Sequence, residues 1–283
     1  MRSGRITAVV IAVAGLAAAC APTEQAATYG ETETAVVTRG TIDIDDNEGV
    51  KTVPFAPERI TALDDRAREL LAALGVEPQS PGSFADLIVA TTAEGSAGER
   101  PEGAYVDLSP REGIPLDWEM VRQVQVLGRI LGREEEAARL DDYFSEARER
   151  ALEARKKAWT FAAVTANQSE LTVQPPNGDA LWEPAFTMLE LKPALPPDKA
   201  VDVQSLKDAQ PTFLFVSERG TELGDAAYVS PMRRLATSPD FGELKAVQQG
   251  NVYVPPLETQ DNASIVTYTK IFNELADQWS VID

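Results

Sequence analysis

The sequence predicts an α/β protein of two lobes that are joined by a single long helix. In both halves of the 283-residue chain, short apolar runs alternate with amphipathic stretches, as expected for strands and helices in turn. Between the halves, small and apolar residues recur every three or four positions from Arg133 to Lys157. Apolar residues make up 43% of the chain, which is enough for one large or two modest domains.

The first half predicts an N-terminal α/β lobe over residues 41–132. It opens with a hairpin signal, because two strand-like runs flank the turn Asn47-Glu48-Gly49. A polar turn then separates a buried run from a helical pattern that stops at Gly75. The predicted elements are strands at 41–46, 51–54, 60–63, 86–90 and 105–108, and helices at 65–74 and 117–131.

Residues 133–157 predict the connecting helix. Three glutamates open this segment and Arg155-Lys156-Lys157 close it, so both ends complement the helix dipole. At about 1.5 Å per residue such a helix reaches roughly 36 Å, the width of a domain. The sequence therefore predicts that it bridges two lobes.

The second half repeats the alternation and predicts a C-terminal α/β lobe over residues 158–283. The predicted elements are strands at 159–166, 212–216 and 251–254, and helices at 179–191, 204–208 and 262–279.

The N-terminus predicts export. Arg2 and Arg5 precede an apolar run that is too short to span a bilayer and is typical of a signal peptide, here residues 1–19. Small residues directly before Cys20 resemble a bacterial lipobox, although Leu16 stands one position early. We expect lipidation at Cys20, a flexible linker over 20–40, and a location on the outer face of the cytoplasmic membrane. The alternative is a plain signal peptide and an unmodified Cys20.

Composition excludes several classes of function. The chain has no histidine, which excludes a Ser-His-Asp triad and His-ligated metals, and one cysteine, which excludes an intrachain disulfide. A net charge of −19 argues against binding to nucleic acid. We expect no cofactor and no metal ligands from the protein.

Several stretches, in order, resemble a known family. They are Asp46-Asn47-Glu48-Gly49, Pro57-Glu58-Arg59-Ile60, Asp107 to Pro115, Arg122-Gln123, Pro211 to Val216, Ala246 to Tyr253 and Asn262 to Thr269. Together, over about residues 38–280, they are similar to iron-siderophore-binding lipoproteins of ABC importers, especially petrobactin- and catecholate-type actinobacterial members. The resemblance implies the class III substrate-binding protein fold, which has two α/β lobes and one connecting helix. The chain departs from the family where only Val76 to Ala85 stand in place of an extra strand and helix, so we expect a trimmed first lobe.

The resemblance implies a receptor that binds a ferric siderophore and delivers it to an ABC permease. A siderophore supplies the iron ligands itself, and arginine and aromatic side chains suit such an anionic chelate. Because ligands bind beyond the carboxyl ends of strands, we expect contacts from arginines that follow strands and from aromatic residues near them. The candidates are Arg66, Arg111, Arg219, Arg100, Trp182 and Tyr268. For each one, a solvated charge, a structural ion pair or a core position is the alternative.

Glu183 is the candidate for docking to the permease, and a favourable charge at a helix N-terminus is its alternative role. We expect a monomer. We also expect that it is not an enzyme, since a helix start explains the adjacent Asp64 and Asp65, the carboxylates that could otherwise suggest an acid/base pair. Two other functions remain open. One is a degenerate receptor that acts as a surface interaction protein, and the other is a receptor for haem or cobalamin.

Overall fold

The computed structural model describes residues 40–79, 84–98, 100–167, 170–197, 199–219, 228–256 and 263–282. Cys20, the predicted signal peptide and linker, and Asn262 lie outside the described residues. Residues 39–283 form one compact unit. No helix among the described residues is both long and apolar enough to cross a membrane.

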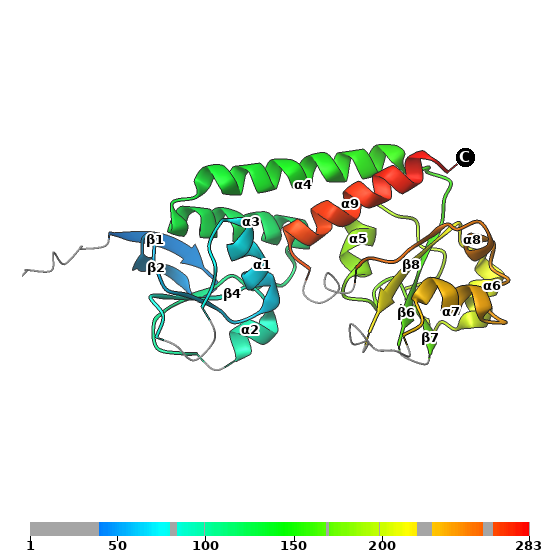
Figure 1. Ribbon diagram of the computed structural model, residues 1–283, viewed down its shortest axis with the longest axis horizontal. Coiled ribbons are helices and arrows are strands. Elements are labelled where there is room, and N and C mark those ends of the chain that lie inside the picture. The colour runs from blue at the N-terminus through cyan, green and yellow to red at the C-terminus, as the bar shows by residue number, and fades with distance from the viewer. Residues whose placement is uncertain are drawn as a thin grey trace, which may run out of the picture. The chain divides into compact units, whose positions relative to one another are not determined.

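The first lobe contains the predicted hairpin and a three-stranded parallel sheet (Figure 1). The hairpin strands β1 and β2 are antiparallel, and the sheet order is β3-β4-β5. All strands and both main helices lie within a few residues of their predicted positions. The elements are β1 (Thr41–Asp46), β2 (Gly49–Pro54), β3 (Ile60–Ala62), α1 (Asp65–Ala73), β4 (Leu87–Ala90), α2 (Ala93–Ala97), β5 (Ala104–Asp107) and α3 (Leu116–Leu131).

The free edge of β3 shows how the first lobe is trimmed. Among the described residues, Gln79 alone pairs with this edge, through a parallel bridge to Thr61. The amide of Gln79 donates to the carbonyl of Ile60 over 2.7 Å. A single bridge thus stands where a further strand would extend the sheet.

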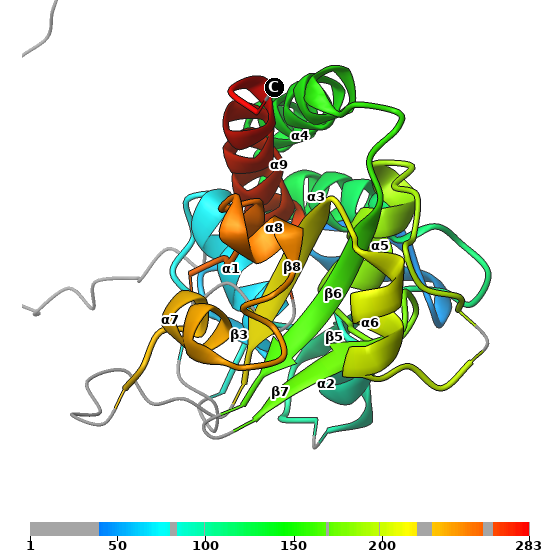
Figure 2. The same cartoon turned by 90° about the vertical axis from the view of Figure 1, so that its right-hand side faces the viewer.

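The long helix α4 (Glu134–Ala154) follows α3 after a left-handed turn at Gly132. The turn reverses the chain, so α4 packs back along α3. The second half of α4 lies beside the closing helix α9 (Ile265–Ser280) (Figures 1 and 2). Arg150 of α4 pairs with Asp277 of α9 at 2.7 Å. The connecting helix therefore packs against both α3 and α9.

The second lobe has a four-stranded sheet in the order β7-β6-β8-β9, in which only the β6–β7 pair is antiparallel. Helices lie on both faces of this sheet (Figure 2). The elements are β6 (Phe161–Ala166), β7 (Leu171–Gln174), α5 (Trp182–Met188), α6 (Val203–Ala209), β8 (Phe213–Glu218), α7 (Pro231–Thr237), α8 (Lys245–Gln248) and β9 (Val252–Tyr253). The sequence analysis missed β7, α7 and α8 here and α2 in the first lobe, and α5 is shorter than predicted.

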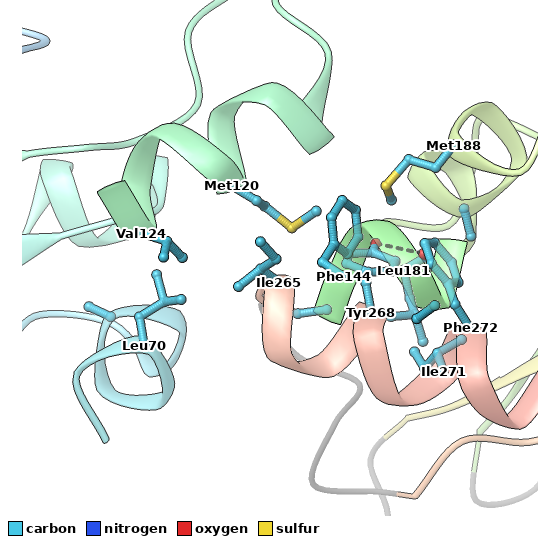
Figure 3. Packing of buried hydrophobic residues seen from close by; sticks show 14 of the residues in the cluster. Leu70, Met120, Val124, Phe144, Leu181, Met188, Ile265, Tyr268, Ile271 and Phe272 are labelled. Atoms are coloured by element: carbon cyan, nitrogen blue, oxygen red, sulfur yellow. Dashed lines mark hydrogen bonds between the residues drawn. The ribbon is translucent and has the colours of Figure 1, made fainter. Parts of the chain in front are cut away.

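One hydrophobic core runs through both lobes. Leu70 of α1, Val124 of α3 and Ile265 of α9 converge on one side of it, and Phe144 and Phe272 continue it toward the second lobe (Figure 3). The rings of Phe144 and Phe272 lie 5.9 Å apart. A smaller separate cluster covers the other face of the second sheet. The shared core joins the lobes through apolar contacts as well as through the chain.

Candidate functional site

The carboxyl edge of the first sheet is organised by Asp64, which directly follows β3 and caps α1. Its carboxylate accepts hydrogen bonds from the Ala67 amide at 2.8 Å, and from the Thr91 amide and hydroxyl at 2.7 and 2.6 Å. The Thr92 amide donates to it over 3.1 Å. One buried carboxylate thereby joins the ends of β3 and β4 to the start of α1.

Arg66 lies beside this carboxylate and is only 9% exposed. Its Nη1 approaches the Thr91 carbonyl at 3.4 Å, and the same carbonyl accepts from Nε2 of Gln123 at 3.1 Å. Burial lowers the pKa of the guanidinium, while nearby Tyr268 and Asp64 favour its charged form. Arg66 is at the predicted edge, but a ligand would reach it only after its surroundings move.

The loop after β5 is held by a buried carboxylate between two arginines. Glu119 is fully buried and accepts from Arg111 at 2.6 Å and from Arg122 at 2.6 Å. Burial acts to raise the pKa of Glu119, but the hydrogen bonds from both arginines outweigh it and lower that pKa. The Arg111 side chain remains 49% exposed, so part of its guanidinium still faces solvent.

Arg100 belongs to a different cluster, next to the hairpin. It pairs with Glu48 at 2.8 Å, and its guanidinium carbon lies 3.9 Å from the centre of the Tyr105 ring. The side chain is about half exposed. Its partners come from the hairpin turn and from β5, so Arg100 fastens the hairpin to the sheet.

The carboxyl edge of the second sheet has its own organising carboxylate, Asp179. It accepts from the amides of Leu181 and Trp182 at 2.9 and 3.2 Å, and so fixes the start of α5. The hydroxyls of Thr165 and Ser217, at the ends of β6 and β8, also donate to it. The two sheets thus end in the same way, at a buried aspartate.

Arg219 follows β8, and its amide donates to the Ala166 carbonyl at 2.9 Å. The residue before it, Glu218, is buried and accepts from the Tyr228 hydroxyl at 3.1 Å. Arg234 of α7 reaches the same carboxylate at 3.6 Å and also donates to the Asn167 carbonyl. The edge therefore contains charged residues that the sequence analysis did not single out.

Two aromatic candidates lie in the core instead of on an open face. Trp182 is fully buried and stacks on Phe215 at 4.6 Å. Tyr268 is 1% exposed, and its hydroxyl donates to the Leu181 carbonyl at 2.8 Å (Figure 3). Helical spacing alone does not show whether such a side chain lies in the core or faces solvent. Both side chains lie in the core, which was the alternative considered for each.

The remaining residues of interest are the docking candidate Glu183 and several residues to which the sequence analysis assigned no role. Gln123 and Arg122 stood in the family-like stretch, and that stretch was the available signal for them. Arg234 was missed because α7 was not predicted, although Ser230-Pro231 is a helix-start signal. Trp118, in the first turn of α3, is 69% exposed and lines a pocket with Phe144 and Arg148 of α4. Glu183 is exposed in the first turn of α5.

No protein-family model matches this sequence, and no curated protein matches it. Solved structures do. One is the siderophore-binding protein BauB, bound to a complex of two acinetobactin molecules and ferric iron. It is 14% identical, with a TM-score of 0.71 over 86% of this chain and 100% of that chain.

A petrobactin-binding protein from Bacillus subtilis, YclQ, is 15% identical, with a TM-score of 0.65 over 86% of this chain and 100% of that one. A TroA-like periplasmic binding protein from Xylanimonas cellulosilytica is 20% identical, with a TM-score of 0.65 over 86% and 99%. These proteins are matched over essentially their whole length. The fold predicted from the sequence is confirmed: the chain has the two-lobed α/β fold of the TroA-like periplasmic binding proteins.

Proposed function

We propose that this chain is an extracytoplasmic receptor that binds a ferric siderophore and delivers it to an ABC permease. The observation that carries the proposal is the whole-length match to BauB, YclQ and related proteins, whose own ligands are ferric siderophores or petrobactin. All of these are binding proteins, which supports a receptor rather than an enzyme. Lipidation at Cys20 and docking through exposed Glu183 complete the proposal.

The arginines at the carboxyl edge of the first sheet support binding of an anionic chelate. Arg111 offers a partly exposed guanidinium, and Arg66 lies deeper behind the same edge. Guanidinium groups donate well to catecholate and carboxylate oxygens. This edge of the first lobe is where we expect the chelate to bind.

The test is a fluorescence titration of residues 21–283 with ferric siderophores of the catecholate, citrate-based and hydroxamate classes. Every buried hydrophobic residue of the two described clusters lies at Ile44 or beyond, so this fragment keeps those clusters whole. Of the four tryptophans, only Trp118 is exposed, while Trp159, Trp182 and Trp279 are buried. We expect saturable quenching by one class and none by its iron-free form. Loss of the quenching in Trp118→Phe, with binding still measured by calorimetry, would show that the quenching reports on Trp118.

Arginine variants test which groups bind. We expect Arg111→Ala to weaken binding by about 1–3 kcal/mol, as for the loss of a charge-assisted hydrogen bond. Arg139→Ala is the matched control, because Arg139 is half exposed on α4 and pairs only with Glu136 among the described ion pairs. Equal affinities of the two variants would remove Arg111 from the site.

A degenerate receptor is the second candidate, and a specific observation favours it. Arg111 and Arg122 are already paired with Glu119, and a single bridge at Gln79 replaces a strand at the sheet edge. An acidic partner that a ligand must displace lowers the net gain from each new contact. No quenching and no heat with any class, in a folded protein, would support this candidate over the first.

A further inference from the structure

The first turn of α9 is hydrogen-bonded to both lobes. Ser264 caps this helix by accepting from the Val266 amide at 3.0 Å, and its hydroxyl donates to Glu69 of α1. The Thr267 hydroxyl, one turn further on, lies 3.0 and 2.8 Å from the two oxygens of the same carboxylate. Ser264 and Thr267 are both almost fully buried. Two buried hydroxyls of the closing helix therefore converge on one side chain of the first lobe.

The same turn of α9 is fixed on its other side. Tyr268 donates to the Leu181 carbonyl, directly before α5 of the second lobe. In Figure 3, Ile265 points toward Met120 and Val124 of α3, away from the Tyr268 contact. The helix thus faces α1 and α3 with one set of residues and α5 with another. Its position decides how the two lobes lie against each other.

The contact with Glu69 differs from the apolar contacts around it because it can be exchanged for water. Glu69 is only partly buried, so its carboxylate can be hydrated if α1 and α9 separate. Hydrogen bonds that exchange with water contribute little net free energy to stability. Such a hydrogen bond can orient α1 and α9 and can be replaced by bonds to water when they separate. An apolar contact between them has no such replacement.

We propose that Glu69, Ser264 and Thr267 form an interlobe latch that sets the angle between the lobes. Arg66, one turn before Glu69, interacts electrostatically with both Glu69 and Tyr268, so the latch lies next to the edge that we assign to ligand binding. The three latch residues are positioning residues and need not touch the ligand. The inference concerns the unliganded protein and holds or fails independently of the proposed function.

The test measures the distance between two spin labels, one on each lobe, in the absence of ligand. The labelling sites are two exposed positions in a Cys20→Ser background. They are Ala72→Cys on α1 and Lys245→Cys on α8. We expect one narrow distance distribution in the parent and a broader one in Glu69→Ala and in Thr267→Val. Glu69→Gln keeps an acceptor for Thr267 and is expected to restore most of the narrow distribution.

Thr269→Val is the matched control. Thr269 is on the same helix, but its hydroxyl bonds the Ile265 carbonyl within α9 at 2.7 Å. A distribution that broadens equally in Thr269→Val and Thr267→Val would show a general effect on α9 and overturn the latch. An unchanged distribution in a folded Glu69→Ala protein would overturn it as well. Far-UV circular dichroism of each variant verifies that the protein is folded.

Discussion

The two sheets both end at a buried aspartate, yet the two aspartates are held by different kinds of donor. Asp64 of the first lobe accepts mainly from backbone amides, those of Ala67, Thr91 and Thr92. Asp179 of the second lobe accepts from the amides of Leu181 and Trp182 at the start of α5, and its described contacts with the strands are through hydroxyls. A backbone donor is present whatever the side chain, whereas a hydroxyl is lost by one substitution. The first edge is therefore robust to changes around the aspartate, and the second depends on Thr165 and Ser217.

The largest expected effect comes from removing each aspartate in turn. Asp64→Ala leaves three amide donors without their acceptor, and we expect a loss of about 3–5 kcal/mol in the free energy of unfolding. Asp179→Ala leaves two amides, while Thr165 and Ser217, 3.1 Å apart, can still bond each other, so we expect about 2–3 kcal/mol. Urea denaturation of both variants measures the difference. A larger loss in Asp179→Ala than in Asp64→Ala would contradict the comparison.

The next effect is the acid dependence of stability that Glu119 gives the first lobe. Hydrogen bonds from Arg111 and Arg122 hold the pKa of Glu119 below its ordinary 4.5, against the effect of burial. A carboxylate whose pKa is lowered on folding stabilises the protein fully above its unfolded pKa, and that contribution is lost as the pH falls from 4.5 toward the folded value. We expect the free energy of unfolding to fall with acid over that range.

The control for this prediction is Glu119→Gln. The variant is expected to be less stable than the parent at neutral pH, because Arg111 and Arg122 lose their charged partner. Its stability should change less between neutral and acid pH, since the titrating group is gone. Equal acid dependence in the two proteins, measured by urea denaturation at each pH, would assign the effect to other carboxylates.

The smallest expected effect lies on the alkaline side and belongs to the second lobe. Burial, together with the 2.5 Å hydrogen bond to Glu274, raises the pKa of Tyr253 above its ordinary 10.0. A group whose pKa is raised on folding stabilises the protein fully below its unfolded pKa, and this is lost as the pH rises beyond 10. We expect Tyr253→Phe to lose stability less steeply than the parent above that pH. Tyr143→Phe, at an exposed site on α4, should follow the parent.

Much of the fold could be read from the sequence where local pattern decides structure. The connecting helix was predicted because its apolar spacing and end charges are local signals, and α4 lies inside residues 133–157. The strand β7 was missed because Leu171–Gln174 pairs only as the second arm of a hairpin after β6, and half of its residues are polar. Its pairing is set by tertiary contacts rather than by its own pattern.

The places of the candidate residues in the fold could be predicted, but the surroundings of their side chains could not. Arg66 and Arg111 lie beyond strand ends, as the rule for ligand sites in α/β sheets implies. Their pairing could not be read, because Glu119 acquires its role only when α3 places it, fully buried, against the preceding loop. Trp182 shows the same limit. The position of Trp182 in the sequence indicated the edge of the second sheet. The burial of its side chain depends on Phe215, which is 33 residues away in the chain and is brought close by the sheet.

The place of α9 has a consequence for the order in which this protein reaches its native state. Leu70 and Val124, from the first half of the chain, share a core with Ile265, which lies far along the sequence (Figure 3). Until α9 has been synthesised, Leu70 and Val124 lack this apolar contact. Complete packing of the first lobe therefore requires α9, and a nascent chain that still lacks α9 exposes part of that core.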